Sequence, residues 1–236
     1  MNKKILAVDC RASLTVINKL KDLGYDIISI PRKQMFDNAV SSHPDIFITV
    51  FNGTVFSDVS IKDSFINIGG VEFLNREAVI GENCYKYPYD IEFNCVLVGR
   101  NLICNEKYTN NQILKYAKNN SLRIINVNQG YAKCSVCVVS DNAIITEDVG
   151  IANKSIECGI DVLLIEKGHV KLAGYDYGFF GGCSGLIEKN LIVFNGSLEK
   201  HPDCERIKCF CKNYNVNTLS LSDDYLYDIG TIMRIV

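Results

Sequence analysis

No long run of charge of one sign occurs in this chain of 236 residues. Its 25 lysines and arginines stand against 27 aspartates and glutamates, a formal net charge of −2, and the two signs are mixed along the sequence. Proteins that bind nucleic acids or anionic membranes usually carry a basic stripe or cluster. Neither partner is therefore expected, and nothing in the sequence indicates an oligomeric state.

Long apolar runs are also missing. The beginning, MNKKILAVDCR, places basic residues before a short apolar run, but Asp9 and Arg11 interrupt it before a signal-peptide core forms. No later segment reaches the ~20 apolar residues of a membrane-spanning helix. Since 47% of the residues are nevertheless apolar, we expect a sizeable buried core in a single domain over residues 1–236.

Paired histidines and a second CxxC are absent, which argues against a four-ligand zinc site. Cys134 and Cys137 form the one CxxC, and Cys209 and Cys211 form a looser CxC. Several of the eleven cysteines lie in apolar strand-like runs of a long chain, which indicates reduced thiols and a cytoplasmic protein. We interpret the two pairs as small core residues and expect neither a metal nor an organic cofactor.

What the chain does contain is a repeat of hairpins. Four segments each have an apolar strand, a turn with asparagine and a second apolar strand: DIFITVFNGTVFS, NCVLVGRNLIC, SVCVVSDNAIIT and GLIEKNLIVFNG. The turn asparagines are Asn52, Asn101, Asn142 and Asn190, at steps of 49, 41 and 48 residues. A helix-like run and a third strand follow three hairpins, whereas residues 60–82 lack a helical period, which predicts a short or missing helix.

The two ends of the chain complete a fifth module. Residues 5–30 match a module that lacks only its first strand, and the last segment, DIGTIMRIV, is a single strand without the rest of a module. Pairing a strand near Ile229 to Ile235 with one near Ile5 to Val8 closes the ring and makes Asn2 the fifth turn asparagine. The fold class predicted is α/β, a five-bladed ββαβ propeller whose closure leaves no exposed sheet edge.

This order of modules resembles the pentein fold, which guanidino-group-modifying enzymes share with a translation initiation factor that binds a ribosomal subunit. The runs FNCVLVGRNLICNEKYT, NQGYAKCSVCVVSDNAIITEDVGI and GYDYGFFGGCSG are also similar to an uncharacterised bacterial family assigned this fold. In the enzymes, arginine deiminase and agmatine deiminase among them, a cysteine follows a glycine-rich turn and leads into the first strand of a module. A histidine in an H-x-D context and acidic residues complete their sites.

On this resemblance Cys183, in GGCSGLIE, is the expected nucleophile, and His43, in HPDIFITV, the expected acid and base. Asp45 of the same triplet is a candidate substrate ligand. The enzymes place their cysteine close to the chain end, whereas a whole module follows Cys183. Two plainer interpretations stay open: Cys183 fits a tight glycine turn as a small residue, and His43 with Pro44 forms a surface turn.

Four further residues are candidates. Asp176 lies between tyrosines in GYDYG and is either a grip for a cation or an ordinary loop carboxylate. Cys134 precedes the first strand of its module, the position that Cys183 holds in the next module. Lys133 beside it would favour a thiolate. Lys133 is alternatively a substrate carboxylate ligand or a solvated surface group. His169 follows a strand at a turn, and His201 caps a helix.

Two functions follow. The first is a cysteine-dependent hydrolase or transferase that acts on a small guanidine- or amidine-containing compound, with acidic residues holding the planar cation. The second is a non-catalytic ring that binds a protein or a small ligand. Asp9 and Asp228 would belong to one blade, but pairing in a hairpin does not by itself place both at one mouth of the ring.

Overall fold

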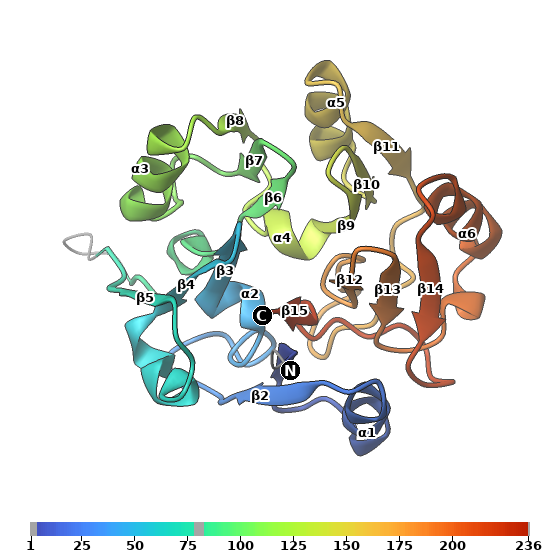
Figure 1. Ribbon diagram of the computed structural model, residues 1–236, viewed down its shortest axis with the longest axis horizontal. Coiled ribbons are helices and arrows are strands. Elements are labelled where there is room, and N and C mark those ends of the chain that lie inside the picture. The colour runs from blue at the N-terminus through green and yellow to red at the C-terminus, as the bar shows by residue number, and fades with distance from the viewer. Residues whose placement is uncertain (1–3, 78–82, 236) are drawn as a thin grey trace.

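A computed structural model describes residues 4–77 and 83–235 and arranges them as five small sheets around a central axis (Figure 1). Each sheet has three strands, the first antiparallel to the second and the second parallel to the third. A helical segment connects the second and third strands. This is the ββαβ module predicted from the repeat, and five copies confirm the five-bladed α/β ring.

The elements of the blades follow the order of the chain. Blade 1 contains β15 (Met233–Arg234), β1 (Ile5–Asp9), α1 (Leu14–Asp22) and β2 (Asp26–Ile30). Blade 2 contains α2 (Pro44–Phe47), β3 (Ile48–Phe51), β4 (Thr54–Asp58), η1 (Val59–Phe65) and β5 (Val71–Leu74). Blade 3 contains η2 (Tyr89–Ile91), β6 (Val96–Val98), β7 (Asn101–Cys104), α3 (Asn111–Asn119) and β8 (Arg123–Asn126). Blade 4 contains α4 (Ala132–Ser135), β9 (Val136–Ser140), β10 (Ala143–Thr146), α5 (Val149–Glu157) and β11 (Asp161–Leu164). Blade 5 contains β12 (Ser184–Glu188), β13 (Leu191–Phe194), η3 (Leu198–Lys200), α6 (Cys204–Asn213) and β14 (Asn217–Ser220).

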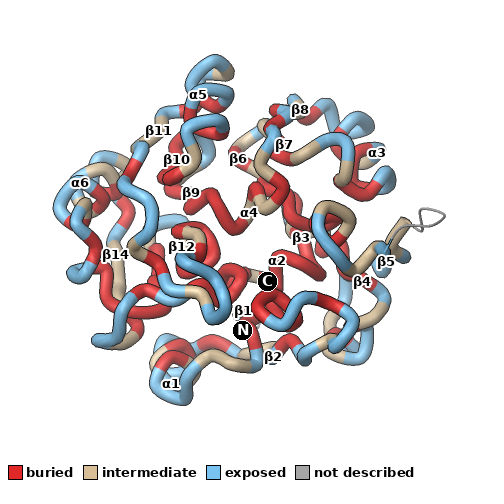
Figure 2. Tube along the Cα trace, turned by 180° about the vertical axis from the view of Figure 1, so that it is seen from behind, coloured by how far each residue is buried: buried red, intermediate tan, exposed pale blue. Residues whose placement is uncertain are grey.

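Closure of the ring by its last strand is confirmed. Strand β15 pairs antiparallel with β1, with Arg234 opposite Leu6 and Met233 opposite Ala7. The amide of Ile235 donates to the carbonyl of Ile5 at 2.9 Å. The first and last strands, β1 and β15, accordingly lie together near the axis (Figures 1 and 2). The fifth turn asparagine, Asn2, lies outside the described residues.

Two local predictions have different outcomes. In blade 2 a 3-10 helix, η1, replaces the α-helix of the other modules, as the missing helical period indicated. Among the hairpin turns of the described residues, a left-handed asparagine occurs only at Asn52, with φ 49°. In blade 3 the left-handed residue is Gly99, with φ 59°, while Asn101 begins strand β7. The prediction for Asn101 was wrong because a glycine two residues earlier adopts this conformation without a Cβ clash.

The core lies between the inner strands and the outer helices. The first strands β15, β3, β6, β9 and β12 surround the axis, and α1, α3, α5 and α6 cover the outside (Figure 1). Buried positions concentrate on the inner strands, as Figure 2 shows in red. Helix α3 illustrates the pattern, because its apolar face buries Ile113, Leu114 and Ala117 while its outer face is polar. In the described part of the chain, no helix is long and apolar enough to span a membrane.

Candidate active site

The site forms where the chain enters the first strand of each blade. Asp45 lies in the short helix α2 before β3, and Cys134 lies in the short helix α4 before β9. Asn94, Gly181 and Thr231 precede β6, β12 and β15. Because the five modules repeat around one axis, these equivalent positions converge there. Residues far apart in the sequence therefore become direct neighbours.

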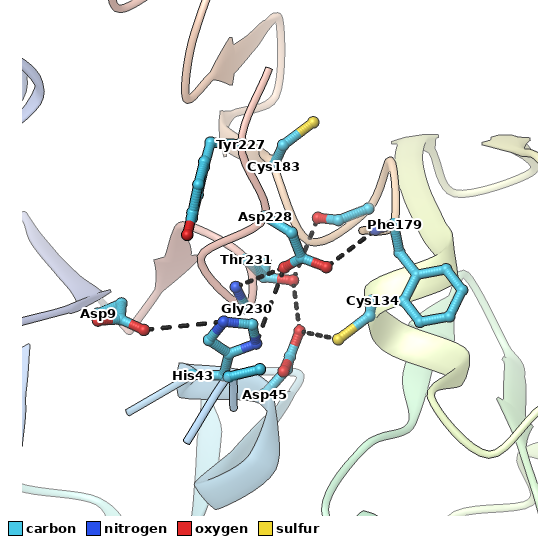
Figure 3. Close-up of polar contacts among 12 residues, drawn as sticks. Asp9, His43, Asp45, Cys134, Phe179, Cys183, Tyr227, Asp228, Gly230 and Thr231 are labelled. Carbon is cyan, nitrogen blue, oxygen red and sulfur yellow. Dashed lines mark hydrogen bonds and ion pairs between the residues drawn. The ribbon is translucent and has the colours of Figure 1, made fainter. Parts of the chain in front are cut away.

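Hydrogen bonds join the converging residues. The thiol of Cys134 donates to Asp45 Oδ2 at 2.9 Å, and the Thr231 hydroxyl contacts the same oxygen at 2.9 Å. The side-chain amide of Asn94 donates to Cys134 Sγ at 3.5 Å and to the Asp45 carbonyl at 3.2 Å. Cys134 is 2% and Asp45 0% exposed. The pair is thus held in a fixed, dry arrangement (Figure 3).

His43 lies beside this pair, between two buried carboxylates. Its Nε2 is 3.8 Å from Asp9 Oδ2, and its Nδ1 is 3.8 Å from Asp228 Oδ1. Neither ring nitrogen has a hydrogen-bond partner, although the side chain is 1% exposed. The ring packs on Gly230, where a Cβ would lie 2.1 Å from the Cβ of His43 and where φ is +67°. Only glycine allows this approach.

The two carboxylates around His43 are themselves fixed. Asp9 accepts hydrogen bonds from the Arg11 guanidinium, at 2.9 Å from Nε to Oδ1, and from the Ser42 hydroxyl at 2.8 Å. Asp228 accepts hydrogen bonds from the backbone amides of Phe179 and Gly230, each at 2.9 Å. Both carboxylates are therefore held by donors other than His43, whose ring nitrogens they face at 3.8 Å.

Burial controls the protonation of this cluster. It raises the pKa of the Asp45 and Asp228 carboxyls and lowers that of the His43 imidazole. Burial and the neighbouring charge of Asp45 raise the pKa of the Cys134 thiol well above its ordinary value. Each shift favours the neutral form of the group. On the carboxyls and the thiol a nearby cation has the opposite effect, because positive charge stabilises carboxylate and thiolate.

A cavity of about 260 Å³ opens onto the cluster. His43, Cys134 and Asp228 form its polar floor. The walls are mostly aromatic and apolar: Val40, Tyr131, Leu172, Tyr175, Tyr177 and Phe179. Asp176 is an exposed residue that also lines this cavity. Apolar walls with a few convergent polar groups are typical of sites for small molecules.

The structure brings most of the predicted site residues together. His43, Asp45 and Cys134 meet at the axis, and Asp176 lines the same cavity. The Lys133 ammonium contacts the Thr231 hydroxyl at 3.4 Å and lines a second cavity between the inner strands. His169 lies apart, partly exposed, with Nε2 3.1 Å from Glu166.

The expectation that Cys183 shares a pocket with a histidine and a carboxylate is corrected. Its side chain is 0% exposed, contacts the carbonyl of Phe180 at 3.2 Å and lies in an apolar cluster with Phe194 and residues of α6. Its sulfur points away from His43 and Asp228 (Figure 3). Gly182, directly before it, is required for packing, because a Cβ at this position would lie 2.1 Å from Asp228 Oδ1.

Sequence reasoning did not select four residues that complete the cluster: Asn94, Thr231, Asp9 and Asp228. The first two stand at the strand entrances of their blades, so module register was the signal that could have found them. Asp9 and Asp228 were recognised as members of one blade. Their shared position around His43 depends on the turn after Asp228, which no local pattern specifies.

Solved structures with the same ring include enzymes of the pentein superfamily. The first is dimethylarginine dimethylaminohydrolase from Pseudomonas aeruginosa in complex with citrulline, 8% identical, with a TM-score of 0.57 over 94% of this chain and 93% of that chain. Agmatine deiminase from C. jejuni is 11% identical, with a TM-score of 0.54 over 93% and 87% of the two chains. An amidinotransferase from Microseira wollei, of the saxitoxin pathway, is 8% identical, with a TM-score of 0.55 over 93% and 88%. These matches show the shared fold.

Sequence comparison gives the family. None of the curated proteins matches the chain. The model of a family of unknown function, DUF6873, matches residues 7–233, which is nearly the whole sequence. The protein is therefore a pentein-fold member of the DUF6873 family.

Proposed function

We propose that the protein is a hydrolase that uses Cys134 as its nucleophile on a small guanidine- or amidine-containing compound. The observation that carries the proposal is the cavity lined by Cys134, His43 and Asp228, with the Asp45 carboxyl bonded to the Cys134 thiol behind it. Structural neighbours named for dimethylarginine, agmatine and amidino transfer support this substrate class.

Charge favours a cationic substrate. Three carboxyl groups, those of Asp9, Asp45 and Asp228, lie around His43 and Cys134. A guanidinium or amidinium among them stabilises their ionised forms and offers planar N–H groups to the carboxylate oxygens. The aromatic walls contributed by Tyr131 and Phe179 suit the faces of a flat cation.

The geometry suggests how the thiol becomes reactive. Asp45 lies 2.9 Å from Cys134 Sγ and, because burial raises its pKa, is suited to accept the thiol proton. The bound cation lowers the pKa of the thiol, so that the thiolate forms only when substrate is present. The thiolate then attacks the central carbon of the substrate and forms a tetrahedral intermediate.

His43 completes the reaction. Burial lowers the pKa of its imidazole, and the charges of Asp228 and Asp9 oppose that effect. In its protonated form it donates a proton to the leaving nitrogen, and the carbon–nitrogen bond breaks. The neutral imidazole then takes a proton from water, whose oxygen attacks the carbon bound to Cys134. The thiolate then leaves, the added hydroxyl gives its proton to the released amine as the carbonyl of the product forms, and Asp45 returns its proton to the sulfur. One water is consumed, and the enzyme groups return to their starting protonation.

Burial of Cys134 also supports a second candidate, a non-catalytic ring that binds a cationic ligand in the same cavity. The raised pKa of the thiol keeps it protonated in the absence of ligand, and a protonated thiol is a poor nucleophile. In this case the ligand binds without turnover. The cavity and its charges are the same for both candidates, so measurements of binding and turnover separate them.

The test is turnover of a panel of small guanidines and amidines by the wild-type protein, Cys134→Ala and Cys183→Ala. Both substitutions remove one buried sulfur, but only Cys134 lines the cavity. Cys134→Ala is expected to lose turnover and retain ligand binding, whereas Cys183→Ala keeps both. Binding without turnover in the wild type favours the non-catalytic ring. Full activity of Cys134→Ala contradicts the hydrolase.

A further inference from the structure

The ligand atoms of Cys134, His43 and Asp45 are close enough to share one ion. A sulfur, an imidazole nitrogen and a carboxylate oxygen from these residues all lie within 4.8 Å of one another, and all three residues are buried. We propose that they form a binding site for a divalent zinc-class ion. Cysteine, histidine and aspartate are among the side chains that bind zinc in proteins, and three protein ligands with an open fourth position are typical of catalytic zinc centres.

Two of the three residues carry buried polar atoms that have no hydrogen-bond partner. Both ring nitrogens of His43 and the Oδ1 atom of Asp45 are buried without a hydrogen-bond partner. Such atoms are uncommon in proteins, because burying a polar group without a partner is costly. An ion bound to His43 Nδ1 and Asp45 Oδ1 gives these two atoms a partner. Figure 3 shows Nδ1 on the side of Asp45 and Cys134, and Nε2 on the opposite side, toward Asp9.

The distances require only small side-chain movements. Bond lengths of about 2.3 Å for sulfur and about 2.1 Å for nitrogen or oxygen put tetrahedral ligand atoms roughly 3.5 Å apart. Asp45 and Cys134 are at 2.9 Å because a thiol proton lies between them, and they separate once the ion replaces that proton. The longest separation, at most 4.8 Å, shortens by about 1 Å.

The side chains that contact the three ligands would also support a bound ion. His43 Nε2 faces Asp9 at 3.8 Å, and a carboxylate behind a ligating imidazole fixes its orientation. The Asn94 amide at 3.5 Å supports a Cys134 thiolate, and the Thr231 hydroxyl contacts Asp45 at 2.9 Å. Asp9 and Asp228, which flank the His43 ring, are two further carboxyl groups close to the three ligands.

The metal site goes beyond the proposed hydrolase and competes with it. His43 and Cys134 line the cavity, so the fourth position of the ion faces the space that a cationic substrate would occupy. With its thiolate bound to the ion, Cys134 has no free sulfur for attack. Zinc binding and substrate binding are therefore mutually exclusive, and because the thiol proton is displaced, the metal affinity rises with pH.

The experiment is a titration of chelator-treated full-length protein with Co²⁺ and Zn²⁺, followed by absorption spectroscopy and calorimetry. Wild-type protein is expected to bind one Co²⁺ with a thiolate-to-metal absorption band and to release it to Zn²⁺. Cys134→Ser is expected to lose the band, and His43→Gln to bind more than tenfold more weakly, since even loss of an outer-sphere group costs about tenfold or more. Cys183→Ser and His169→Gln, changed outside the cluster, keep both properties.

The melting temperature of each variant is measured first, because substitution in a buried cluster can unfold the chain. If a variant is unfolded, wild-type protein provides the answer, since Zn²⁺ must protect Cys134 from alkylation while the exposed Cys10 still reacts. No binding by the wild type, or a Co²⁺ band that persists in folded Cys134→Ser, overturns the proposal. These readouts do not depend on turnover, so loss of the hydrolase hypothesis leaves this test intact.

Discussion

Removal of residues 229–236 is expected to unfold the whole ring. The deleted segment contains four apolar side chains that are at most 6% exposed: Ile229, Ile232, Met233 and Ile235. At about 1.5–3 kcal/mol for each buried side chain, the loss is roughly 6–12 kcal/mol, an upper estimate because the unfolded chain is itself partly compact. Domains are stable by about 5–15 kcal/mol in total. The deletion therefore removes most of the stability.

The deletion also breaks backbone bonds in two blades. Strand β15 pairs with β1, and the amides of Ile229 and Thr231 donate to the Gly182 carbonyl at 3.1 and 2.8 Å. The assay is urea unfolding followed by circular dichroism, with Arg234→Ala as the control. Arg234 is partly exposed and bonds Glu188 at 3.0 Å, so its loss is expected to cost at most about 1 kcal/mol. A truncated protein with an unchanged midpoint refutes the closed ring as a source of stability.

Three further predictions concern thiols, pH and the glycine turn. Alkylation of native protein followed by peptide mass spectrometry should label the exposed Cys10 and Cys209 first and the buried Cys183 last; early labelling of Cys183 contradicts its burial. Burial raises the pKa of Glu147 to about 7, so wild-type stability falls as pH rises from about 4.5 to 7. Glu147→Gln should match the wild type at pH 4.5 and exceed it by up to about 3 kcal/mol at pH 8 in urea unfolding, and equal stability at pH 8 counts against the shift. Gly182→Ala should abolish ligand binding, measured by calorimetry, because its Cβ would displace the Asp228 carboxylate; unchanged affinity speaks against Asp228 as part of the site.

The sequence contained enough to predict the ring. Each hairpin is local, with alternating strands and a turn residue that can be recognised without any long-range contact. Closure followed from the two incomplete ends, and the pairing of β15 with β1 confirms it. The error at Asn101 was also local, since Gly99 competes for the left-handed position two residues earlier.

The site was less accessible to sequence reasoning. Module register placed Cys134 and Cys183 at equivalent strand entrances, but register does not specify toward which side of the chain a side chain points. The helical turn α4 directs Cys134 to the axis, whereas the glycine turn carries Cys183 into the apolar cluster beside α6. The glycines before Cys183 were interpreted as a feature of a nucleophile site. Gly182 is instead required because a side chain there would collide with the Asp228 carboxylate.

The most direct test of the account compares two alkylating reagents of equal size, chloroacetamidine, which is cationic, and chloroacetamide, which is neutral. The metal-free wild-type protein is treated with each, and the rate of labelling at Cys134 is followed by peptide mass spectrometry, with the exposed Cys10 as internal reference. The account predicts that the cation labels Cys134 much faster than the neutral amide, relative to Cys10, because the carboxylates bind it and its charge stabilises the thiolate. Equal relative rates, or labelling that leaves Cys134 untouched, would contradict a cation site built around this thiol.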